Sequence, residues 1–69
     1  MVSHMYKVKD MDGKVKVYRN TEWNEWIVKV TGDTSWGWYY TDDKRDALDT
    51  AQLIYDKIQA NEYIYATSN

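Results

Sequence analysis

A chain of 69 residues is expected to form one domain, near the lower size at which a hydrophobic core is stable without disulfides or metals. The absence of cysteine excludes a disulfide framework and a thiolate zinc site, and a formal net charge of -2 favours no particular partner. No apolar run approaches the length of about 20 residues needed to cross a bilayer, so we expect a cytoplasmic protein without membrane contact.

The first four residues, Met-Val-Ser-His, resemble an expression-tag remnant. We therefore set residues 1–4 apart and expect residues 5–69 to form a single small domain. This assignment gives His4, the only histidine of the sequence, to the tag. Alternation, turn pairs and a later helical period predict strands at about 5–10, 14–19, 25–31 and 35–41 and a helix at about 43–60.

The first two strands are predicted to form a β-hairpin around Asp12-Gly13, a pair typical of a type I′ turn because both turn residues must accept positive φ. A two-residue turn gives this register: Met11 opposite Lys14, Lys9 opposite Lys16, Val8 opposite Val17 and Tyr6 opposite Arg19. The register places Val8, Val15 and Val17 on one sheet face. The other face then carries Lys7, Lys9, Lys14, Lys16 and Tyr18.

The third strand alternates Trp26, Val28 and Val30 with Glu25, Ile27 and Lys29. Its inward side is expected to be the valine side, which faces the helix together with the valines of the hairpin. Gly32-Asp33 predicts the next turn, and the stretch TSWGWYYT that follows is the fourth strand. Alternation along this strand places Trp36, Trp38 and Tyr40 on one face and Tyr39 on the other.

The length of the connection at Gly32-Asp33 decides whether the aromatic residues are core or surface. A connection of three residues pairs Val28 with Trp38 and Trp26 with Tyr40, which buries the large rings. A connection of two residues pairs Val28 with Gly37 and Trp26 with Tyr39, which leaves Trp36 and Trp38 on the surface. We favour burial, because a small domain needs its largest side chains inside and a helix lined with alanine leaves room for tryptophan.

The helix is predicted to begin at a cap formed by Thr41, Asp42 or Asp43 and to end near Asn61. Its apolar stripe consists of Ala47, Leu48, Ala51, Ile54, Tyr55 and Ile58, and Leu53 lies off that stripe. Tyr63-Ile64-Tyr65 is either a short last strand or an ordered tail. The expected fold class is α+β, an antiparallel meander of three to four strands with one C-terminal helix packed on one sheet face and the other face open.

Catalytic chemistry is poorly represented in the sequence. With His4 assigned to the tag, neither histidine nor cysteine remains to act as a general base or nucleophile, so we do not expect an enzyme. The acidic residues Asp42, Asp43, Asp46 and Asp49 suit the positive end of the helix dipole, and Asp10 to Lys14 is a hairpin turn without calcium-loop spacing. We therefore expect neither a metal nor a cofactor.

Basic residues mixed with aromatic residues on an open sheet suggest binding of single-stranded nucleic acid, with cations on phosphates and rings against bases. The candidates for that function are Lys7, Lys9, Lys14, Lys16, Tyr18 and Lys29. The simpler interpretation, that exposed strands carry lysine for solubility and to prevent edge pairing, is preferred.

The segments NEWIVKV and YYTDDKRDALDTAQ resemble small, mostly uncharacterised proteins encoded by phages and prophages of Gram-negative bacteria. The matching positions are Glu25, Trp26, Val28 and Lys29, then Tyr39 or Tyr40, Thr41, Asp42, Asp43, Lys44, Asp46, Ala47 and Thr50-Ala51. The resemblance covers about half of the chain, from the third strand into the helix. It implies the meander-and-helix fold and a phage or prophage setting in the host cytoplasm, where many accessory proteins of this size bind and block a host enzyme or defence complex.

Our first functional hypothesis is a non-enzymatic protein that binds and modulates a host or phage protein, because Trp and Tyr are frequent interface anchors. The candidate contact residues are Trp23, Leu53, Ile27 and Tyr39, of which Trp23 is the aromatic residue expected to be most exposed. Self-association as a homodimer is a special case of this hypothesis. The alternatives are single-stranded nucleic-acid binding and a structural component without separable activity.

Overall fold

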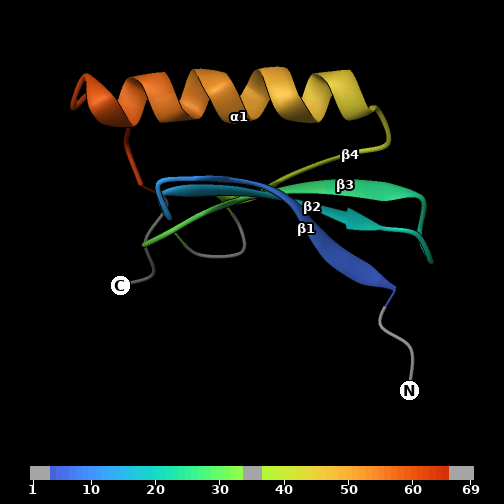
Figure 1. The fold of residues 1–69 in the computed structure, drawn as a ribbon. Helices are drawn as coiled ribbons and strands as arrows, with labels where there is room; N and C mark the ends of the chain where they lie inside the picture. The colour runs from blue at the N-terminus through green and yellow to red at the C-terminus, as the bar shows by residue number, and fades with distance from the viewer. Residues whose placement is uncertain (1–3, 34–36, 66–69) are drawn as a thin grey trace.

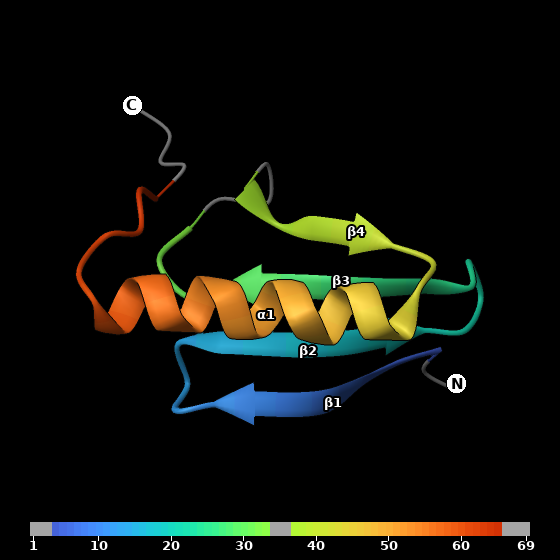
Figure 2. The same ribbon diagram turned by 90° about the horizontal axis from the view of Figure 1, so that it is seen from above.

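The computed structural model describes residues 4–33 and 37–65 (Figure 1). Within them the elements are β1 (Met5–Met11), β2 (Val15–Asn20), β3 (Glu25–Val30), β4 (Tyr39–Thr41) and α1 (Lys44–Gln59). The strands form one antiparallel sheet in the order β1-β2-β3-β4, and α1 crosses one face of it above the central strands (Figure 2). The predicted α+β meander with one C-terminal helix is therefore confirmed.

The core between α1 and the sheet is built from small aliphatic side chains. Val15, Val17 and Val28 are fully buried against Ala47 and Ala51 of the helix. Larger side chains from the predicted helical stripe and the sheet pack around this cluster, namely Met11, Trp26, Leu48, Ile54, Tyr55 and Ile58. Each fully buried valine contributes about 1.5–3 kcal/mol, so a few such residues supply much of the driving force for a domain of this size.

The β1–β2 hairpin has the predicted turn, but its register near the turn differs from the prediction. Asp12 and Gly13 have φ values of 57° and 71°, and Lys14 N donates to Met11 O at 2.9 Å. Met11 nevertheless pairs with Val15 rather than with Lys14, because the Lys14 carbonyl accepts a hydrogen bond from Thr31 N at the end of β3 (2.9 Å).

A β-bulge between Lys7 and Lys9 restores the predicted register farther from the turn, where Tyr6 is opposite Arg19. Two predictions on β1 are therefore wrong. Lys9 pairs with Val17 instead of Lys16, and Val8 lies in the bulge with 40% of its surface exposed instead of in the core. The extra residue of a bulge exchanges the faces of the side chains beyond it.

Strand β4 follows neither of the two predicted registers. Tyr39 is opposite Val28, Tyr40 is opposite Ile27, and Thr41 is opposite Trp26. Tyr39 therefore lies on the side of α1, whereas Tyr40 lies on the opposite face, so the favoured burial of Tyr40 in the core is wrong. The strand is also shorter than predicted, since Gly37 and Trp38 are not part of it; the predicted position of Trp36 lies outside the described residues.

Both ends of α1 are capped by local hydrogen bonds. Asp43 is the N-cap among the three predicted candidates, and its Oδ1 accepts from Arg45 N at 2.9 Å and from Asp46 N at 3.3 Å. At the C-terminus, Asn61 adopts a φ of 59°, and Glu62 N donates to Lys57 O at 2.8 Å. This is the Schellman arrangement with asparagine in the left-handed position, and it ends the helix where the sequence predicts.

The chain after α1 folds back onto the turn that follows β3 as an ordered tail without strand pairing. Tyr63 Oη donates to Asp33 Oδ2 at 2.6 Å, and the rings of Tyr63 and Tyr65 meet edge to face with centroids 4.8 Å apart. Tyr65 also lies against Gly32. A Cβ added at Gly32 would be 3.7 Å from the Tyr65 ring. The tail thus holds the start of the connection that leads to β4.

The Val17→Ala substitution is expected to lower the free energy of unfolding by about 2–3 kcal/mol, because it leaves a cavity in a fully packed site. The same change at the half-exposed Val8 is expected to cost less than about 1 kcal/mol. Urea unfolding followed by tryptophan fluorescence measures both. Equal losses would show that Val8 occupies the core and that the β1 bulge is wrong.

Stability above neutral pH is expected to depend on Tyr63. Burial, followed by the hydrogen bond to Asp33, raises the pKa of Tyr63 well above its ordinary value. As the pH rises past about 10, the unfolded tyrosine loses its proton while the folded one keeps it, so the free energy of unfolding falls with pH. Urea unfolding at a series of pH values should show a smaller fall for Tyr63→Phe than for the wild type. Parallel pH profiles would contradict this role of Tyr63.

Candidate functional site

The sheet face opposite α1 carries two rows of side chains that run across the strands. Val17 and Val28 face the helix, so their neighbours in sequence point to the other side. One row joins Lys7, Tyr18, Ile27 and Tyr40, and the next joins Asp10, Lys16 and Lys29. We call these seven residues, together with Trp38, the open face.

Lys29 holds the open face together by a contact with two aromatic rings. Its Nζ lies 4.5 Å from the ring centroid of Tyr18 and 4.6 Å from that of Trp38. A cation over an aromatic face contributes about 0.5–1 kcal/mol at an exposed site and more where water is excluded. Among the described residues no acceptor meets the buried Trp38 Nε1, so ring contacts rather than a hydrogen bond position the indole.

Ile27 shows how closely the aromatic residues of the open face pack. Only 6% of its surface is exposed, although it lies on the side of the sheet that no helix covers. Its direct cross-strand neighbours are Tyr18 and Tyr40, and side chains in such pairs lie about 5 Å apart at Cβ. The open face therefore has a small apolar centre of its own, with Tyr40 still 46% exposed at its edge.

The charges on the open face fall into a neutralised pair and an unneutralised pair. Lys7 Nζ lies 2.8 Å from Asp10 Oδ2, and this hydrogen bond raises the pKa of Lys7 and lowers the pKa of Asp10. Asp10 also accepts from Gly13 N at 2.8 Å. Lys16 and Lys29 lie directly opposite each other, and neither has a salt bridge within the described part of the chain. The net charge of the open face is therefore that of the ammonium groups of Lys16 and Lys29.

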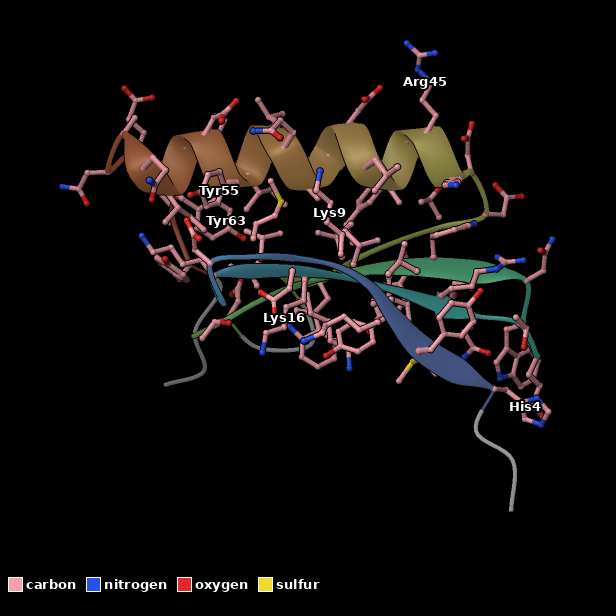
Figure 3. All side chains as sticks on the ribbon, viewed as in Figure 1. His4, Lys9, Lys16, Arg45, Tyr55 and Tyr63 are labelled. Carbon is pink, nitrogen blue, oxygen red and sulfur yellow. The ribbon has the colours of Figure 1, made fainter. Side chains whose placement is uncertain are left out.

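The acidic residues of α1 lie on the other side of the sheet. Arg45 points away from the sheet into solvent in Figure 3, and it forms an exposed 3.7 Å ion pair with Asp49. Asp56 accepts a hydrogen bond from Gln52 one turn earlier, at 2.9 Å. The three aspartates of α1 balance its two lysines and one arginine, so the helix is neutral, whereas the open face on the other side of the sheet is basic.

Four of the six predicted nucleic-acid-binding residues lie together on the open face: Lys7, Lys16, Tyr18 and Lys29. The other two do not. Lys9 points from β1 toward α1, whereas Lys16 points to the open side (Figure 3). Lys14 lies in the hairpin turn, where its Nζ donates to Gln59 Oε1 of the helix at 2.8 Å.

The predicted protein-contact residues are not brought together. Trp23 and Leu53 are 73% and 57% exposed, as predicted, but Trp23 lies between β2 and β3 and Leu53 lies on α1. Ile27 is on the open face but buried there. The placement of Tyr39 on the open face is wrong: its Oη donates to Asp46 Oδ2 at 2.5 Å on the helix side, and this bond raises the pKa of Tyr39.

Trp38 and Tyr40 are the site residues for which the sequence favours burial, although the alternative with a two-residue connection places Trp38 on the surface. The signal that bears on them is Gly37, which comes directly before Trp38. A Cβ on Gly37 would lie 2.5 Å from Asp33 Oδ2, so a larger residue at this position would require the Asp33 carboxylate to move. A glycine inside an apparent strand marks a close approach of the chain and an interruption of the alternation.

The described part of the chain contains no group of three or more residues suited to bind a metal and no pocket. In the same residues, no helix is long and apolar enough to span a membrane. Comparison with protein-family models, with curated proteins and with solved structures gives no match for this chain.

Proposed function

We propose that this chain is a small non-enzymatic protein that binds another protein through its open face. The observation that carries the proposal is that Trp38, Tyr40 and Tyr18 lie on the face that α1 leaves uncovered. Ile27 lies between the two tyrosines, and Lys29 contacts both Tyr18 and Trp38. A domain this small needs large side chains in its core, so three aromatic residues outside the core favour a role in contact. Tyr and Trp are the residues most often found as interface anchors.

The resemblance to small phage and prophage proteins supports a more specific form of the proposal. In that form, the chain is an accessory protein that acts in the host cytoplasm and modulates a host protein by blocking or remodelling its surface. The contacts of Lys29 with both rings suit this role, because side chains that are held in place before binding lose less conformational entropy on binding.

Single-stranded nucleic acid is the second candidate partner, and the net positive charge of the open face favours it. Lys16 and Lys29 lie on the open face, whereas the carboxylates of α1 lie on the far side of the sheet. Two lysines without a salt bridge among the described residues attract a polyanion to the open face, whereas the three aspartates of α1 balance its three basic residues and leave no net positive charge there.

Affinity capture from bacterial lysate, with and without nuclease, tests the proposal when three forms of the protein are compared. The wild type should retain a discrete protein after nuclease treatment, and Tyr40→Ala should lose it. Trp23→Ala is the matched control, because it removes an exposed aromatic ring that is not on the open face. We expect Trp23→Ala to retain the partner.

Two results would contradict the proposal. Captured material that disappears with nuclease would assign the open face to nucleic acid. Loss of the partner in Trp23→Ala but not in Tyr40→Ala would move the contact surface to the loop between β2 and β3. Thermal unfolding of each variant shows whether the folded domain is present in each capture.

A further inference from the structure

We propose that the open face accepts an acidic peptide segment of its partner, with the ammonium groups of Lys16 and Lys29 binding carboxylates and with Trp38 and Tyr40 packing beside the segment. This inference rests on the proposed function, because it names the chemistry of the partner for the same surface. Its basis is the arrangement of charges and rings rather than the exposure of the face.

The pairing of Lys16 with Lys29 is the first step. The two lysines are direct cross-strand neighbours, and both are half-buried. Like charges in that position destabilise a sheet, and across the described residues neither lysine has a carboxylate within salt-bridge distance. The carboxylate next to Lys16 in the same row, Asp10, is already bonded to Lys7 and to Gly13 N. An external anion placed between the two ammonium groups would relieve their repulsion.

The aromatic residues decide which anion fits. Nucleic-acid bases bind such surfaces by stacking on the faces of exposed rings. On the open face, Tyr18 and Trp38 each turn one ring face to Lys29, at 4.5 Å and 4.6 Å, so the ammonium already occupies the space where a base would stack. A carboxylate can instead approach the ammonium itself, while peptide side chains pack against the ring edges and Tyr40.

The number of lysines without an acidic partner also favours a short acidic peptide over nucleic acid. A polyphosphate chain gains affinity from many lysine contacts, but only two ammonium groups of the open face lack an acidic partner among the residues described. Two lysines beside aromatic rings match a short acidic segment.

Selection from a displayed library of short random peptides against the full chain tests the inference. Selected peptides should be enriched in Asp and Glu relative to the starting library. A fluorescently labelled peptide from the selection should bind the wild type at least about tenfold more tightly than a Lys16→Gln/Lys29→Gln double variant, as expected when two charged contacts are lost. Lys57→Gln, which removes an exposed lysine of α1, is the matched control and should leave the affinity unchanged.

Three results would overturn the inference. The first is selected peptides without acidic enrichment, and the second is an affinity that is unchanged in the double variant. The third is labelled oligothymidine that binds more tightly than any selected peptide, which would identify nucleic acid as the ligand. If the double variant does not fold, Lys16→Gln alone serves in its place, because it leaves Lys29 and the two rings that Lys29 contacts unchanged in sequence.

The capture experiment separates this inference from the proposed function. A protein partner that is lost with Tyr40→Ala but retained by the lysine double variant would overturn the acidic-segment inference and leave protein binding by the open face in place. No nuclease-resistant protein partner in the wild type would contradict the proposed function itself.

Discussion

Strand β3 is paired on both sides, with Val28 opposite Val17 of β2 and Tyr39 of β4, and this double pairing assigns every side chain of the sheet to one of two faces. Val28 faces α1, so Ile27 and Lys29 face away from it. Tyr40 is directly opposite Ile27 and therefore also lies on the open face. Trp38 lies there too, because its ring contacts the Lys29 ammonium. A shift of one residue in β4 would exchange the aromatic surface for a buried cluster, and the candidate binding site would be lost.

The small side chains of α1 explain why the large rings are not in the core. Ala47 and Ala51 are fully buried, and they allow the helix to lie close to the valines of the sheet. Because alanine brings the helix close to the sheet, no space remains between them for tryptophan, contrary to the prediction. Among the described tryptophans, Trp26 packs on the core. It does so at the margin, where Arg19 lies 4.9 Å and Lys44 lies 5.8 Å from its ring centroid.

Features that depend on a few neighbouring residues could be predicted from the sequence. The Asp12-Gly13 turn, the Asp43 cap, the end of α1 near Asn61 and the helical stripe all follow from local conformational preferences, and all are confirmed. Registers could not be predicted, because they depend on distant contacts. The Lys14 carbonyl accepts a hydrogen bond from Thr31 N, which is distant in the sequence. The Asp33 side chain lies close to Gly37. The sequence therefore predicts the lysines and Tyr18 of the open face, whereas it leaves Trp38 open between core and surface and favours a buried Tyr40.

The central claim is that Lys29 lies between Tyr18 and Trp38 on the face away from α1. Proton NMR tests it directly, since protons above an aromatic ring are shifted upfield and give nuclear Overhauser effects to the ring protons. The account predicts upfield-shifted Lys29 side-chain methylenes with cross-peaks to both rings. Cross-peaks from the Trp38 indole to the methyl groups of Ala47 and Ala51, with unshifted Lys29 methylenes, would contradict it, because they would place the indole in the core.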